Sequence, residues 1–178
     1  MSDSLHTNGK TIRLLKGDIT GLEVEAFVYY AQHNLNLGSG FGTAISTRGG
    51  LKIQEELKQF GTLETTAAVT TEAGMLKAKY IIHAVGPRFK ESNMEKKLEK
   101  TIVNSLKQAE EKNIKQLAFP PMGTGFYGVP LNMCARVMFN TITKYLNGET
   151  QIEEVIVGLL DSREYEPFKQ QLNASIAA

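Results

Sequence analysis

The chain has 178 residues, of which 42% are hydrophobic and 22% charged, values that are ordinary for a globular protein with one sizeable core. Its net charge of +1, from 20 basic and 19 acidic residues, excludes a surface field strong enough to hold nucleic acid nonspecifically. The single cysteine, Cys134, excludes an internal disulfide and a cysteine-rich zinc site, and its helical context predicts a small core residue.

The polarity of the first residues predicts where the folded part begins. Residues 1–10 are polar and lack the apolar stretch of a signal peptide, and no apolar run in the chain is long enough to span a bilayer. We therefore expect a flexible N-terminal tail over residues 1–10 and a single domain over residues 11–178, in a soluble cytoplasmic protein.

Short apolar runs alternate with helical patterns along the chain. Apolar and β-branched runs predict strands at 11–16, 26–30, 67–71, 80–85, 116–119 and 154–160. Helical spacing predicts a short helix that reaches residue 45 and longer ones at 51–60, 94–112, 132–146 and 163–176. Pro130 suits the first turn of the helix that follows it. This alternation predicts a three-layer α/β/α sandwich around a mixed, mostly parallel sheet.

Two glycine-rich loops are the most informative feature of the chain. Residues 37–45 read LGSGFGTAI and residues 119–130 read FPPMGTGFYGVP. Each loop follows a predicted strand and precedes a predicted helix, so both belong at the edge of the sheet where ligands bind in such folds. Glycines expose backbone N–H groups, and a helix start adds unpaired donors with a partial positive charge. The pair of loops predicts a site for two phosphates or for a long polyanion.

Neither loop has the sequence of a common phosphate-binding motif. A Walker loop needs Gly-Lys followed by Ser or Thr, whereas Gly128 is followed by Val129. The spacing and downstream acid of a dinucleotide-binding fingerprint are also missing. The loops therefore argue against a kinase and against an ordinary dehydrogenase.

Four segments resemble, in sequence and in order, those of the macro domain family, which binds ADP-ribose. The segments are residues 17–20 (GDIT), 38–45, 78–87 (AKYIIHAVGP) and 119–130, and the residues around Leu160 fit as well. The resemblance covers residues 11–172. Residues 43–57, with Arg48-Gly49-Gly50, are more loosely similar to the branch that includes the macro domain of a variant core histone.

The resemblance implies ADP-ribose as the ligand, with no cofactor and no metal. Asp18 would accept a hydrogen bond from the exocyclic amine of adenine, next to Ile19, or it would only cap a turn. One side of the diphosphate would be wrapped by Gly38, Ser39, Gly40 and Phe41. The other side, and the distal ribose, would be reached by Gly123, Thr124, Gly125, Phe126 and Tyr127. We expect one of the two aromatic residues to cover the ribose and the other to pack under the loop.

The chain departs from the family in three places. Many macro domains have Asn-Ala-Ala-Asn where this chain has Tyr29-Tyr30-Ala31-Gln32, so Gln32 replaces the asparagine that contacts the distal ribose. Tyr29 and Tyr30 should point to opposite faces of their strand. The hydrolase branch has an aspartate after the first loop, whereas residues 41–44 contain no acid. Leu160 occupies an adenine-facing position that is often aromatic.

These observations favour a monomeric protein that recognises ADP-ribose or ADP-ribosylated macromolecules, with neither a membrane nor nucleic acid as a partner. The alternative from another class is a hydrolase of O-acetyl-ADP-ribose or of protein-linked ADP-ribose. Gln32 and His33 are the candidates for catalytic support in that case, because they lie at the mouth of the first loop. A binder of poly(ADP-ribose) or RNA and a scaffold that has lost its ligand are two further alternatives.

Overall fold

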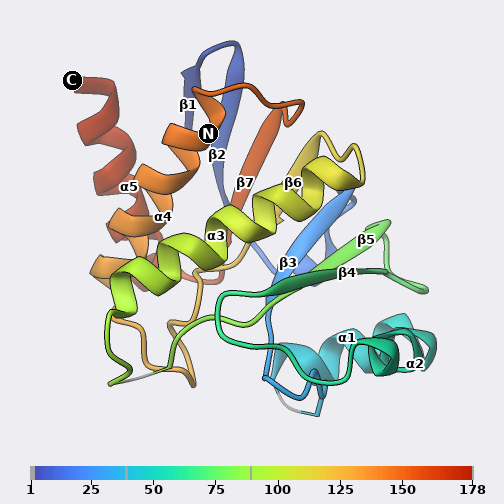
Figure 1. The fold of residues 1–178 in the computed structure, drawn as a ribbon. Helices are drawn as coiled ribbons and strands as arrows, with labels where there is room; N and C mark the ends of the chain where they lie inside the picture. Colours follow the sequence, from blue (N-terminus) through green and yellow to red (C-terminus); the bar gives the residue numbers. More distant parts are fainter. Residues whose placement is uncertain (1–2, 39, 89, 178) are drawn as a thin grey trace.

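A seven-stranded sheet forms the centre of the computed structural model, which describes residues 3–38, 40–88 and 90–177. The strand order is β1-β2-β7-β6-β3-β5-β4 (Figure 1). The five inner strands run parallel to one another, while β1 and β4 pair antiparallel at the two edges. The strands are β1 (Asp3–Thr7), β2 (Lys10–Lys16), β3 (Ala26–Tyr30), β4 (Ala68–Glu72), β5 (Tyr80–Ala84), β6 (Gln116–Phe119) and β7 (Glu154–Leu159).

Helices cover both faces of the sheet, which confirms the predicted three-layer sandwich. The helices are α1 (Phe41–Gly49), α2 (Lys52–Leu57), α3 (Met94–Glu111), α4 (Leu131–Leu146) and α5 (Ser162–Ala177), with short 3₁₀ turns η1 (Ile19–Gly21) and η2 (Lys58–Phe60). Helices α3, α4 and α5 pack on one face, and α1 and α2 pack on the other (Figure 1). Within the described ranges, no helix is long and apolar enough to cross a membrane.

The hydrophobic periodicity explains how the two cores form. Leu98, Ile102, Leu106 and Ala109 lie on one stripe of α3 and are fully buried, as their spacing predicts. Strand β3 is buried on both faces because it lies inside the sheet, so its residues alternate between the two cores.

The N-terminal residues are a strand, so the prediction of a flexible tail over residues 1–10 is wrong from Asp3 onwards. Strand β1 forms an antiparallel hairpin with β2 through Asn8 and Gly9, whose φ angles of 52° and 73° fit a type I′ turn. Asp3 accepts hydrogen bonds from Tyr165 and Lys169 of α5. An edge strand needs little apolar surface, which explains why its polar sequence resembles that of a tail.

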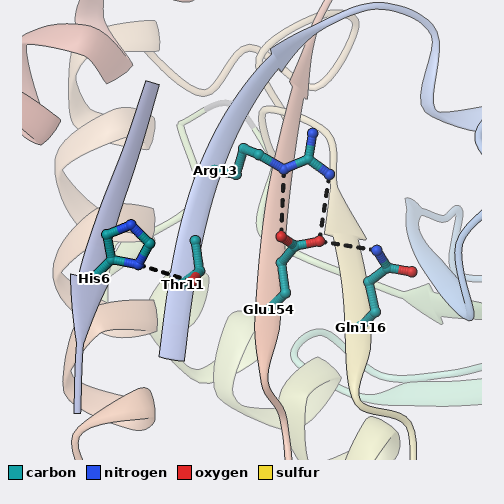
Figure 2. Close-up of polar contacts among 5 residues, drawn as sticks. All are labelled: His6, Thr11, Arg13, Gln116 and Glu154. Atoms are coloured by element: carbon teal, nitrogen blue, oxygen red, sulfur yellow. Dashed lines mark hydrogen bonds and ion pairs between the residues drawn. The ribbon is translucent and has the colours of Figure 1, made fainter. Parts of the chain in front are cut away.

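A row of polar contacts crosses the sheet at the amino ends of β6 and β7 (Figure 2). The guanidinium of Arg13 donates from Nε and Nη2 to the two carboxylate oxygens of Glu154, both at 3.4 Å, and Gln116 Nε2 donates to Glu154 Oε1 at 2.9 Å. Burial raises the pKa of Glu154, but the hydrogen bonds from Gln116 and Arg13 and the charge of Arg13 outweigh it and lower this pKa. The row links β2, β7 and β6 at the end of the sheet away from the glycine-rich loops.

Candidate functional site

A cleft of about 490 Å³ opens at the carboxyl ends of the parallel strands. The two loops meet there because β3 and β6, the strands that precede them, are neighbours in the sheet. Nine of the predicted ligand-binding residues line the cleft, namely Ile19, Gly40, Phe41, Gly123, Thr124, Gly125, Phe126, Tyr127 and Leu160. Asp18, Gln32 and Gly38 are not part of its lining, and Ser39 lies outside the described residues.

Asp18 is held at the edge of the cleft by three hydrogen bonds. Its Oδ1 accepts from the backbone N and the hydroxyl of Thr20, at 2.9 and 2.7 Å, and its Oδ2 accepts from Arg48 Nη1 at 3.2 Å. Burial raises its pKa, but the bonds from Thr20 and Arg48 lower it more, so the carboxylate stays ionised. Asp18 therefore caps η1, and its neighbours Gly17 and Ile19 line the cleft.

The first loop brings the start of α1 to the cleft. Gly40 is the N-cap residue with φ of 56°, and it has no side chain that could satisfy the amides of the first turn. Thr43 N and Ala44 N already donate to Gly40 O, at 3.1 and 3.3 Å. The amides of Phe41 and Gly42 have no acceptor among the described residues, so these two are available to an anion. Gln54 of α2 holds the loop, because it accepts from Leu37 N at 2.9 Å and donates to Leu35 O at 3.1 Å.

The second loop closes on itself and exposes one aromatic ring. Val129 N donates to Gly123 O at 2.9 Å, and Gly123 has φ of 77°. A Cβ at Gly125 would meet no atom within 4 Å, so this residue borders open space. Phe126 is 97% exposed, whereas Tyr127 packs against Tyr30 with 5.0 Å between ring centroids. The packing of Tyr127 fits the expectation that one ring lies under the loop, whereas the expectation that the other ring covers the ribose stays a prediction.

Tyr29 and Tyr30 form the floor of the cleft from opposite faces of β3, as alternation predicts. Tyr30 belongs to the core under α3 and α4, and its hydroxyl donates to Pro87 O. Tyr29 belongs to the core under α1 and α2, and its hydroxyl makes no hydrogen bond within the described part of the chain. Burial raises the pKa of Tyr29 to about 12, so this hydroxyl is a neutral donor.

The histidines near the site have structural partners. His33 Nδ1 donates to Leu63 O at 2.7 Å and its Nε2 lies 3.4 Å from Thr65 Oγ1, and His33 is not part of the cleft lining. His83 is buried, which lowers its pKa to about 3 and keeps it neutral. Over residues 3–38, 40–88 and 90–177, no cluster of three or more His, Cys, Asp or Glu side chains could hold a metal ion.

Two buried side chains complete the surroundings of the cleft. Cys134 lies under the second loop, where its thiol donates to Met122 O at 3.4 Å and burial raises its pKa, which fits the predicted core role. Glu164 of α5 lines the cleft although the sequence analysis did not single it out. The spacing from Asp161 to Glu164 is that of a capping box, a signal that gives no hint of a ligand.

This arrangement, a mixed sheet between two helical layers with two glycine-rich loops at its carboxyl edge, defines the fold of a macro domain. A family model described as "Macro domain" matches residues 28–138, and the chain belongs to this family. A macro domain-containing protein of Caldanaerobacter subterraneus is 42% identical over 165 residues, which cover 89% of this chain and 94% of that protein. An uncharacterized protein of Saccharolobus solfataricus is 40% identical over 170 residues, 93% of this chain and 94% of that protein.

Solved structures agree with this assignment. A mutant macrodomain of Oceanobacillus iheyensis with ADPR superposes with a TM-score of 0.94 at 26% identity, and the match covers 100% of both chains. A Trypanosoma brucei macrodomain in complex with ADP gives a TM-score of 0.85 at 25% identity, over 90% of this chain and 68% of the other.

Proposed function

We propose that this protein binds ADP-ribose, free or attached to a macromolecule, in the cleft between the two glycine-rich loops. The observation that carries the proposal is that both loops line one open cleft without a cationic side chain among its described lining residues. A diphosphate there is bound by backbone N–H groups of the first turn of α1 and of the second loop. The Oceanobacillus structure with ADPR has the same fold and supports the assignment.

In this assignment each part of ADP-ribose occupies its own part of the cleft. Adenine lies at the end that contains Ile19 and Leu160, with the ionised Asp18 as the acceptor for its exocyclic amine. The diphosphate lies between Gly40–Phe41 and Thr124–Gly125, and Phe126 covers the distal ribose beside Gln32. The protein acts as a monomer in the cytoplasm, without a cofactor and without contact to nucleic acid or a membrane.

The structure offers no observation in favour of the hydrolase alternative. Such an enzyme needs a base near the distal ribose, and the candidate for that role, His33, bonds to Leu63 and Thr65 instead. The first turn of α1, residues 41–44, supplies no acid either. We therefore propose recognition, and we assign no catalytic role to Gln32 or His33.

Calorimetric titration with ADP-ribose tests the proposal. Gly125→Val places a side chain in the open space beside the second loop, so it should abolish binding while the thermal midpoint stays near that of the wild type. Gly21→Val is the matched control, because a Cβ there also meets no atom within 4 Å and the residue does not line the cleft. Folded wild-type protein that gives no heat with ADP-ribose would reject the proposal.

Asp18→Asn separates the turn cap from the contact to the base. Asparagine still caps η1, so the fold should persist, but its uncharged amide is a poorer acceptor for adenine. We expect ADP-ribose affinity to fall by about 1–3 kcal/mol. Unchanged affinity would place adenine elsewhere.

A further inference from the structure

Glu164 is the single charged residue among the described residues that line the cleft. It lies in the first turn of α5 and is 8% exposed. Its Oε1 accepts from Leu160 N at 2.8 Å, and its own backbone N–H donates to Asp161 Oδ1 at 2.9 Å. The bond from Leu160 N fixes the carboxylate at the wall of the cleft, and the bond to Asp161 fixes the backbone of Glu164 in the first turn of α5.

The second oxygen of this carboxylate retains capacity for a donor. Within the described part of the chain, Glu164 Oε2 forms an ion pair with Arg163 Nη2 at 3.9 Å, which is too long for a hydrogen bond. The Arg163 side chain is 71% exposed, so water screens this ion pair. A largely buried carboxylate is stabilised when a further donor reaches it, and a ligand in the cleft that Glu164 lines can supply one.

The sheet order places Glu164 between the two ends of the cleft. Strand β7, which leads into α5, lies between β2, which precedes Ile19, and β6, which precedes the second loop. The charge of Glu164 also contributes to the raised pKa of Cys134, which lies under that loop. If the nucleobase lies at Ile19 and the diphosphate at the loops, the group opposite Glu164 is the ribose that joins them.

Resting on the proposed function, we infer that Glu164 accepts a hydrogen bond from the 2′,3′-diol of the adenosine ribose and thereby selects against ligands phosphorylated on that ribose. A carboxylate is a strong acceptor for hydroxyl donors, and dinucleotide-binding proteins also use a carboxylate, elsewhere in their fold, to bind the ribose 2′-hydroxyl. A phosphate on the diol would replace the donor with at least one negative charge. The buried carboxylate repels that charge because water is largely excluded around it.

The test compares ADP-ribose with ADP-ribose 2′-phosphate by calorimetry, using the wild type, Glu164→Gln and the control Glu166→Gln. Glu166 lies on the same helix, is exposed and does not line the cleft, so its substitution makes the same charge change outside the site. We expect the wild type and Glu166→Gln to prefer ADP-ribose about tenfold or more. Glu164→Gln should reduce this preference to about threefold or less, because its amide donates to phosphate.

The possible results distinguish a failure of the inference about Glu164 from a failure of the proposed function. A wild type that binds both ligands equally overturns the inference while the proposed function stands, whereas a wild type that binds neither rejects the proposed function. A preference that persists in folded Glu164→Gln also overturns the inference. If this variant does not fold, wild-type affinities for ADP, 2′-deoxy-ADP and 3′-deoxy-ADP decide the question. At least one deoxy ligand should bind about tenfold more weakly than ADP, and equal affinities for all three would refute the contact.

Discussion

Gly42 is a position where a change that normally stabilises a helix should destabilise this protein. Alanine in a helix is favoured over glycine by about 1 kcal/mol. A Cβ at Gly42, however, would lie 2.6 Å from the Tyr29 hydroxyl and 3.0 Å from backbone atoms of Leu37. Overpacking of this kind costs about 1–3 kcal/mol, and two neighbours must shift here. Because two neighbours shift, we take the upper part of this range, about 2–3 kcal/mol, and after the gain of about 1 kcal/mol we expect Gly42→Ala to lower the free energy of unfolding by about 1–2 kcal/mol.

A double-mutant cycle measured by urea unfolding separates the clash with the Tyr29 hydroxyl from the clash with Leu37. Tyr29→Phe alone should change stability by less than about 0.5 kcal/mol, because the hydroxyl has no partner among the described residues. In that background the cost of Gly42→Ala should fall by about 1 kcal/mol, since the nearest contact is gone and the contact to Leu37 remains. The free energies of unfolding of the wild type, both single variants and the double variant are compared, and their m-values should agree.

The ligand supplies a second measurement for the same variants. Gly42 lies in the first turn of α1, so a displaced helix start should also weaken ADP-ribose binding. Gly21→Ala is the control, because no atom lies within 4 Å of its Cβ, and its stability should stay within about 0.5 kcal/mol of the wild type. A Gly42→Ala protein as stable as the wild type, with additive effects in the cycle, would refute the packing argument.

Three further outcomes follow from the contacts of single side chains. Tyr30→Phe removes the donor to Pro87 O and should lower the free energy of unfolding by about 1 kcal/mol in urea titrations; no loss would show that this bond does not contribute. Gln54→Ala frees the backbone of the first loop and should weaken ADP-ribose binding in calorimetry, whereas Lys58→Ala, at the exposed start of η2 directly after α2, should not. The pKa of Glu154 is below its ordinary value of 4.5, so the stabilisation by its carboxylate is complete above about pH 4.5 and is lost as the pH falls through the lowered pKa. The difference in the free energy of unfolding between the wild type and Glu154→Gln should therefore shrink from pH 7 to pH 3. A difference that stayed constant over this range would contradict this account.

The local patterns of the chain were sufficient to predict most of the fold. The spacing of Leu98 and Ile102 marks the buried stripe of α3, and the run 26–30 marks the central strand. The hairpin β1–β2 is hard to predict because the polarity of residues 3–7 resembles that of a tail, although Asn8-Gly9 is a strong hairpin signal.

The site was predictable where it consists of backbone and less so where it depends on long-range contacts. The glycines of both loops indicate the cleft directly, since main-chain geometry follows from local sequence. Gln54 lies 17 residues from Leu37, and no local pattern predicts that it holds this backbone. Glu164 has the spacing of a helix cap, so its place at the cleft depends on how β7 is positioned in the sheet.

The proposed binding of an anion by main-chain donors has a consequence for divergence within the family. Peptide N–H groups are the same for every residue type except proline, so most side chains around the loops can change without altering the donors. The Oceanobacillus macrodomain illustrates this tolerance, because it shares the fold at a TM-score of 0.94 with 26% of its residues identical. Differences in ligand preference between such relatives are then expected to reside in a few side chains at the rim and floor of the cleft.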